Sequence, residues 1–246
     1  MKKIEFVSKI PGVVDLYPIV EAKDCLPRWA ESARNNYIQN KKTQQGRFNH
    51  IYQCPGIFDL MTQGYIVPMW HDVIISTNGN PDEFGWTVPT SEILELNTDT
   101  DIIENQTNGF GSLMPIKPWS LNTLIKINTP WNIIAPKNVK LLILPIAYPD
   151  RFEFESSIGI LDPGYSNEVN IQMFYNVAKG DVTIKAGTPL AQIIPLSEKD
   201  FTLICRDMNN WDKLWLQKKK YFENATFKIK RNKIKDLYHK HFGDSR

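Results

Sequence analysis

The stretch Gly159-Ile160-Leu161-Asp162-Pro163-Gly164-Tyr165 is a short β-prone run that ends in a tight turn. Asp, Pro and Gly favour such turns, because Pro presets its own backbone angle and Gly tolerates unusual ones. After the turn, apolar residues alternate with polar ones at Val169, Ile171 and Met173. This period of two is typical of a strand with one buried face. The stretch therefore predicts two strands joined by a tight turn.

Similar runs lie on both sides of this turn, and each is bounded by Pro, Gly or Asn. They are 123–128, 140–146, 151–154, 157–161, 169–175, 181–185 and 190–196. Seven short runs at this spacing indicate a sandwich or barrel-like module and not a βαβ fold. We therefore expect a mainly β protein, α+β overall, with its sheet module over residues 121–205.

Residues 1–120 predict an irregular N-terminal part that contains strands and short helices. One short helix is expected with Pro27 in its first turn, and a second short helical turn over residues 55–61. Residues 65–77 then alternate as a strand interrupted by Pro68, with a partner strand around 84–88.

The C-terminal segment, residues 206–246, is a separate electrostatic unit. It holds twelve Lys and Arg against five Asp and Glu, a net charge of +7, whereas residues 1–205 carry −5. Asn210 is placed to cap a helix whose one face carries Trp211, Leu214, Trp215 and Phe222. This basic helical tail is either a solvated surface or a contact for an acidic partner or nucleic acid.

Asp162 and Tyr165 offer the most specific chemistry in the chain. A carboxylate at a sheet edge can hold a sugar hydroxyl or a water molecule, and the ring of Tyr165 can pack against a ring of a ligand. The same residues also suit a plain hairpin turn, in which Asp162 accepts hydrogen bonds from backbone N–H groups. Local spacing leaves both interpretations open.

Three segments of the chain resemble the dUTP pyrophosphatase and dCTP deaminase superfamily. They are residues 127–136, residues 159–176, and Lys185-Ala186-Gly187-Thr188-Pro189-Leu190-Ala191-Gln192-Ile193-Ile194. The resemblance implies a β-clip-like module, with Asp162 beside the deoxyribose 3′-hydroxyl and the attacking water. It also implies that Tyr165 stacks on the sugar and that Gln192 supports the pocket. Because those enzymes build their sites between subunits, it implies a homotrimer as well.

The chain departs from that pattern on the phosphate side. Residues 144–148 read Leu-Pro-Ile-Ala-Tyr where the family has an Arg-Ser-Ser loop, and Gln172 or Met173 stands where the deaminase has its catalytic Glu. Catalysis needs contacts that strengthen in the transition state. We therefore expect a nucleotide or nucleoside binder that neither hydrolyses dUTP nor deaminates dCTP. Its expected ligand-binding residues are Asp162, Tyr165, Gln192 and, as the one cation near the altered loop, Arg151.

Over a longer span the chain resembles a protein family encoded by tailed phages of marine bacteria. The similar features include Cys54-Pro55-Gly56-Ile57-Phe58-Asp59, Gly64-Tyr65-Ile66-Val67-Pro68 and Gln192-Ile193-Ile194-Pro195. This resemblance implies a viral origin and a location in the host cell cytoplasm. It leaves a second function open, that of a non-enzymatic phage structural or host-interaction protein acting through its surface and basic tail.

Other classes of site have no support in the sequence. The three cysteines lie far apart without a CxxC, and His71 and Asp72 are neighbours on an expected strand, so their side chains point to opposite faces. No P-loop, G-x-S-x-G or G-x-G-x-x-G is present. We expect no metal and no cofactor. Without an apolar N-terminal segment or a long apolar run, we also expect a protein that is neither secreted nor membrane-spanning.

Tryptophan is abundant, with seven residues in 246. Four of them lie near expected strands, where they either pack in the core or form a stacking wall for a ring-shaped ligand. These four are Trp70, Trp86, Trp119 and Trp131.

Overall fold

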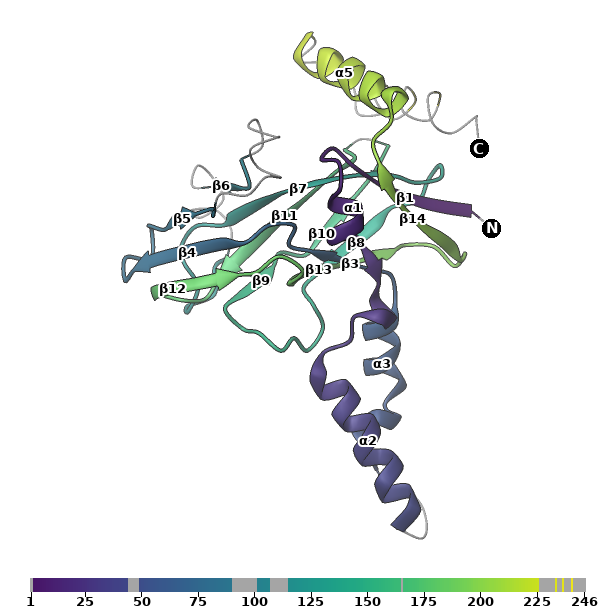
Figure 1. Ribbon diagram of the computed structural model, residues 1–246, viewed down its shortest axis with the longest axis vertical. Coiled ribbons are helices and arrows are strands. Elements are labelled where there is room, and N and C mark those ends of the chain that lie inside the picture. The colour runs from purple at the N-terminus through teal and green to yellow at the C-terminus, as the bar shows by residue number, and fades with distance from the viewer. Residues whose placement is uncertain are drawn as a thin grey trace.

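A computed structural model describes residues 2–43, 49–89, 101–106, 115–164 and 166–225, and the single positions 233, 236 and 240. Most of its regular elements are strands, which lie in three sheets (Figure 1). The expectation of a mainly β protein is therefore confirmed. In the described part of the chain, no helix is long and apolar enough to cross a membrane.

The largest sheet has six strands in the order β14-β1-β7-β11-β9, with β6 also pairing to β7. Its strands are β1 (Lys2–Ser8), β6 (Ile103–Asn105), β7 (Ile125–Ile134), β9 (Phe154–Ser156), β11 (Glu168–Tyr175) and β14 (Phe201–Asp207). The pairing of β1 with β14 is parallel, and the other pairs of this sheet are antiparallel.

The second sheet has five strands in the order β10-β8-β13-β3-β2, and the third has three in the order β12-β4-β5. The five strands are β2 (Val20–Glu21), β3 (Tyr65–Pro68), β8 (Leu141–Leu144), β10 (Gly159–Leu161) and β13 (Pro189–Pro195). The three are β4 (Val73–Asn78), β5 (Gly85–Thr87) and β12 (Lys179–Ile184).

Alternating apolar residues bring the three sheets around one core. Along β11, Val169, Ile171, Met173 and Tyr175 are buried while the residues between them are half-exposed. They share a single cluster with buried side chains of β1, β3, β4, β7 and β13. Burial of this much apolar surface is the dominant favourable term in folding.

Each of the seven expected runs of the sheet module overlaps a strand, β7 to β13, although the run 151–154 shares only Phe154 with β9. The expected single strand over 65–77 is wrong, because β3 and β4 belong to different sheets. Trp70 and His71 are buried in the link between them, where the Trp70 Nε1–H donates to the Asn128 carbonyl at 2.9 Å. Residues 1–120 supply strands to all three sheets.

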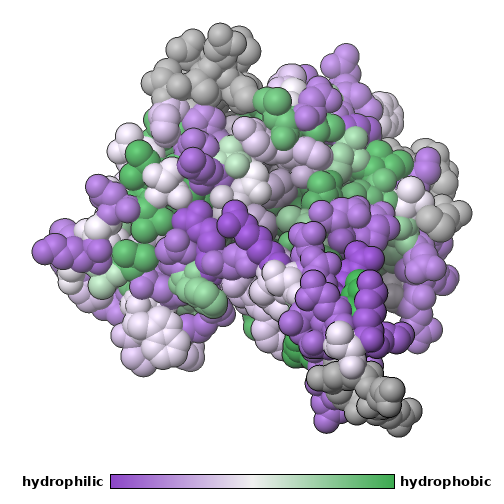
Figure 2. Space-filling model, turned by 60° about the horizontal axis from the view of Figure 1, so that its bottom comes forward, coloured by the Kyte–Doolittle hydropathy of each residue, from purple (hydrophilic) through white to green (hydrophobic). Residues whose placement is uncertain are grey.

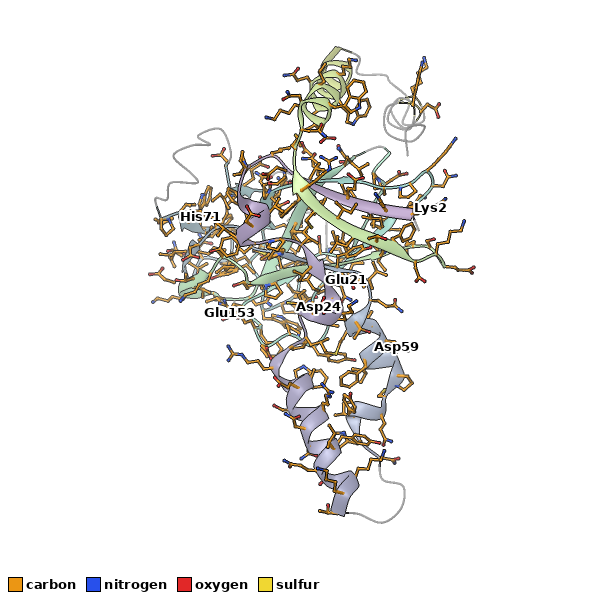
Figure 3. All side chains as sticks on the ribbon, turned by 45° about the vertical axis from the view of Figure 1, so that its right-hand side comes forward. Lys2, Glu21, Asp24, Asp59, His71 and Glu153 are labelled. Atoms are coloured by element: carbon orange, nitrogen blue, oxygen red, sulfur yellow. The ribbon has the colours of Figure 1, made fainter. Side chains whose placement is uncertain are left out.

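A two-helix arm projects from the β body (Figure 1). It consists of α2 (Arg28–Thr43), a 3-10 turn η2 (Ile51–Gln53) and α3 (Pro55–Thr62). Glu21 and Asp24 lie at its junction with the body, where β2 leads into the 3-10 turn η1 (Ala22–Asp24) (Figure 3). The arm's surface is mostly hydrophilic, with hydrophobic side chains on the body beside its base (Figure 2).

Aromatic rings hold the arm together. Centroid distances are 5.5 Å for Tyr37–Tyr52, 5.0 Å for Tyr52–Phe58 and 5.9 Å for Phe58–Trp29. The series continues into the loop after β8, where Tyr148 contacts Trp29 at 6.0 Å. The Trp29 Nε1–H also donates to the Tyr148 carbonyl at 2.9 Å. The arm is thus anchored to that loop by both packing and hydrogen bonding.

The helix α5 (Asn210–Ala225) follows β14 at the end of the body opposite the arm (Figure 1). Its cap is Asn209 and not Asn210, because the Asn209 side chain accepts from the Asp212 N–H at 2.9 Å and Asp212 accepts from the Asn209 N–H at 3.0 Å. This reciprocal pair is the capping-box arrangement. Of the expected apolar face, Trp215 is buried against Val7 and Ile134, whereas Trp211 and Leu214 are exposed. The side chain of Phe222 and most residues from 226 onward lie outside what the structure describes.

Candidate functional site

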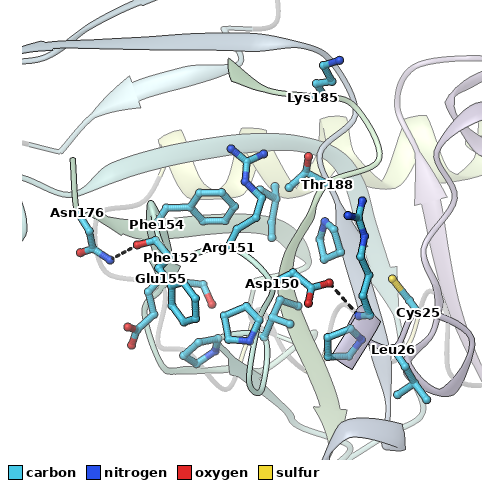
Figure 4. Close-up of a pocket in the computed structure, with 18 of the residues that line it drawn as sticks. Cys25, Leu26, Asp150, Arg151, Phe152, Phe154, Glu155, Asn176, Lys185 and Thr188 are labelled. Atoms are coloured by element: carbon cyan, nitrogen blue, oxygen red, sulfur yellow. Dashed lines mark hydrogen bonds between the residues drawn. The ribbon is translucent and has the colours of Figure 1, made fainter. Parts of the chain in front are cut away.

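A cavity of about 1020 Å³ lies beside the base of the arm, with lining residues from β9 of the six-stranded sheet and from β13 of the five-stranded sheet (Figure 4). Its wall comes from the start of α2, the loop between β8 and β9, strand β9, and the turn between β12 and β13. Residues 117–119 and Asn176 complete it. Segments that are distant in the sequence thus meet at this one place.

Four basic and two acidic side chains line the cavity: Arg28, Lys117, Arg151, Lys185, Asp150 and Glu155. Two of the basic ones are neutralised, since Arg151 pairs with Glu153 at 3.0 Å and Lys117 pairs with Glu155. Among the described residues, no ion pair is found for the exposed side chains of Arg28 and Lys185. Asp150 likewise makes no ion pair among the described residues, so its charge offsets one of these two, and the lining keeps a net positive charge.

Aromatic side chains line the same cavity. Trp119 is 63% exposed and Phe152 is 75% exposed, although both are large and apolar, whereas Phe154 is buried. Phe152, Glu155 and Asn176 lie on one side of the cavity, and Lys185 and Thr188 lie on the other (Figure 4). One side is thus suited to a ring and the other to an anion.

Three titratable groups at or near the cavity have shifted pKa values: Glu153, Cys25 and Tyr175. The hydrogen bond from Arg151 lowers the pKa of Glu153, which keeps that carboxylate ionised. Burial raises the pKa of the Cys25 thiol, so the thiol is neutral near pH 7 and a poor nucleophile. Burial also raises the pKa of Tyr175 to about 12. None of these shifts favours a reactive form of the side chain.

Asp162 lies in the turn after β10 and does not line this cavity. Its Oδ1 accepts from the Gly164 N–H at 3.2 Å, and its carbonyl accepts from the Ser166 N–H at 2.9 Å. These bonds are those of the plain turn that the sequence left open as one interpretation. Tyr165 lies outside the described residues.

Gln192 is buried on β13 and joins that strand to the end of α3. Its Nε2 donates to the carbonyls of Leu60 and Gln63, both at 2.7 Å. In the sheet register Gln192 is level with Leu144, while Leu161, the neighbour of Asp162, is level with Leu141. Asp162 and Gln192 are thus about four positions, or roughly 13 Å, apart along the strands and do not meet within one chain.

Of the described residues expected to bind a ligand, Arg151 alone lines the cavity. The lining residues that sequence reasoning missed are Arg28, Lys185 and Phe152. Trp119 was considered as a stacking residue, and that observation was the one available signal. Nothing in the linear order of the chain indicates that Arg28 and Lys185 face the same space.

No group of three or more His, Cys, Asp and Glu side chains suited to a metal occurs within the described ranges. His71 is buried, with Nδ1 at 2.8 Å from the Asp72 carbonyl, and the Asp72 carboxylate accepts from the Ala186 N–H at 2.7 Å. The two residues are therefore engaged with separate backbone groups.

Comparison of the chain with protein-family models and with curated proteins finds no match.

Proposed function

We propose that the protein is a non-catalytic binding protein for a nucleotide, held in the cavity beside the base of the arm. The observation that carries the proposal is that two kinds of side chain line the same cavity. Arg28 and Lys185 are basic and lack ion-pair partners in the described chain. Trp119 and Phe152 are exposed aromatic rings. A nucleotide presents both of the matching features, an anionic phosphate and a flat aromatic base.

The energetics favour such a ligand on both sides of the cavity. Hydrogen bonds between a charged donor and a phosphate are about twice as strong as neutral ones. Stacking of a base on an aromatic side chain contributes about 1–3 kcal/mol. The size of the cavity, about 1020 Å³, is at the upper end of the usual range for ligand sites and accommodates a mononucleotide.

Binding without catalysis fits the acidic side chains of the cavity. The Asp150 carboxylate accepts from the Arg28 N–H at 2.9 Å and so caps α2, and Glu155 is paired with Lys117. Both carboxylates are held by structural partners, which leaves neither poised as a general base.

A thermal-shift assay tests the proposal with UMP, dUMP, AMP and ribose 5-phosphate as probes. A nucleotide at a hundredfold excess over its dissociation constant should stabilise the native protein by about 2.7 kcal/mol. The double variant Arg28→Ala/Lys185→Ala should lose most of this stabilisation, and raising the salt concentration should weaken binding to the unaltered protein.

Lys9→Ala is the matched control, because Lys9 is exposed and pairs with Glu168 away from the cavity. It should bind nucleotides as the unaltered protein does. Asp162→Asn should also leave binding unchanged. If Asp162→Asn abolishes the shift and the double variant retains it, the ligand binds at the turn after β10 and the cavity is the wrong site.

A further inference from the structure

Ser156 is a buried polar residue at the inner side of the cavity. It is 1% exposed, lies on β9 two residues after Phe154, and lines the cavity together with that ring. Among the described residues, its Oγ has no hydrogen-bond partner. A buried hydroxyl without a hydrogen-bond partner destabilises the fold, so its presence in a native protein calls for an explanation.

The other polar side chains on that side of the cavity are already engaged. Asn176 donates from Nδ2 to the Phe152 carbonyl at 3.0 Å, and its Oδ1 accepts from the Ser120 hydroxyl at 2.6 Å. Glu155 pairs with Lys117. Of these groups, the Ser156 hydroxyl is the one with its full hydrogen-bonding capacity still available.

We propose that Ser156 is the specificity-determining residue of the cavity and binds the polar edge of the ligand's ring. The inference rests on the proposed nucleotide site and assigns the recognition of the base to one side chain. A serine hydroxyl has one donor and two acceptor positions, so it can pair with the mixed donor and acceptor edge of a nucleobase. A ring without polar atoms would leave the hydroxyl unpaired.

The test is Ser156→Ala, probed with uridine and adenosine by calorimetry and with thermal melting of the unliganded protein. If the hydroxyl serves the ligand, its removal relieves an unpaired buried group, so the unliganded variant should melt at the same temperature or higher. Nucleoside affinity should fall about three- to tenfold, the loss of one hydrogen bond. Binding of ribose 5-phosphate, which has no base, should not change.

Tyr175→Phe is the matched control. The Tyr175 hydroxyl is also buried without a hydrogen-bond partner in the described chain, but Tyr175 does not line the cavity. This variant should melt at the same temperature or higher and should bind nucleosides with unchanged affinity.

Two results would overturn the role of Ser156. One is a lower melting temperature of unliganded Ser156→Ala, which would show that the hydroxyl stabilises the fold. The other is nucleoside binding that is equal in Ser156→Ala and the unaltered protein, or absent from the unaltered protein. If nucleotides bind and nucleosides do not, the inference is wrong and the proposed function stands. If nucleosides bind and a phosphate group adds nothing to their affinity, the role of Ser156 is retained and the proposed anion site is wrong.

Discussion

Gly64 shows how one residue can fix the contact between two elements. It follows α3 with φ of +73°, and a Cβ added to it would lie 2.1 Å from the Ile193 carbonyl oxygen of β13. Its own carbonyl accepts from the Ala22 N–H at 2.9 Å. The glycine therefore lets the end of the arm approach the five-stranded sheet at backbone distance.

Gly64→Ala should destabilise the protein by at least about 3 kcal/mol, because the left-handed conformation and the backbone collision both oppose the new Cβ. Gly12→Ala is the control, since Gly12 has φ of +81° but open space around its Cβ position. It should cost only about 1–2 kcal/mol. Urea unfolding measures both values, and equal losses would show that the collision with β13 is relieved at no cost.

At the scale of single residues, the sequence identified polar groups but not their partners. Asp162 was recognised as either a ligand group or a turn residue, and its bonds to Gly164 and Ser166 are local ones that the Asp-Pro-Gly pattern predicts. Gln192 instead bonds to carbonyls 132 and 129 residues away. Such a partner depends on tertiary packing, which local spacing does not report.

Among the helices, α2 is capped from a distant part of the chain. The Asp150 carboxylate accepts from the Arg28 N–H at 2.9 Å, although the two residues are 122 positions apart. Pro27, expected in the first turn of a short helix, predicted the start of α2 to within one residue, although the helix is sixteen residues long. The capping group itself was not predictable, since capping signals are normally sought within a few residues of the helix.

Asp150→Ala should destabilise the protein by about 1 kcal/mol, the usual effect of losing a helix cap. Asp150→Asn keeps an acceptor oxygen and loses only the charge at the helix N-terminus, so it should cost less. Chemical unfolding followed by circular dichroism compares the two variants. If Asp150→Ala leaves the free energy of unfolding unchanged, water replaces the carboxylate at the N-terminal end of α2.

Strands were predicted correctly where apolar and polar residues alternate within a short run. Strands that lack this alternation and pair with a distant part of the chain were missed. The runs from 123 to 196 all overlap strands, because short apolar alternation bounded by turn residues was a sufficient signal. β1 and β14 were missed. β1 is buried on both faces at Glu5, Phe6 and Val7, so it lacks a clear period of two.

For the whole molecule, the pairing of β1 with β14 ties the start of the described chain to its C-terminal third. Arg206 on β14 pairs with Glu5 on β1 at 2.9 Å and with Asp212 of α5 at 2.5 Å. The side chains of Glu5 and Asp212 are only 7% and 3% exposed. Arg206, where the basic tail was expected to begin, is therefore part of the β body.

A chain that ends at Cys205 should be destabilised by at least about 3–5 kcal/mol, because the buried Glu5 carboxylate would lose Arg206. Loss of Trp215 would also uncover Val7 and Ile134. A chain that ends at Ala225 keeps these contacts and should melt at a higher temperature than the chain that ends at Cys205. Thermal unfolding compares the three, and equal melting temperatures for all would refute a structural role of residues 206–225.

The parallel pairing of β1 with β14 also has a consequence for biosynthesis. The two strands are separated by about 200 residues, and ribosomes add roughly 5–20 residues per second, so β14 follows β1 by about 10–40 s. During this interval one edge of β1 has no strand to pair with, and the long chain loop has yet to close. The six-stranded sheet is therefore completed only after Asp207 has emerged, and nascent chains translated side by side expose the same open edge to one another.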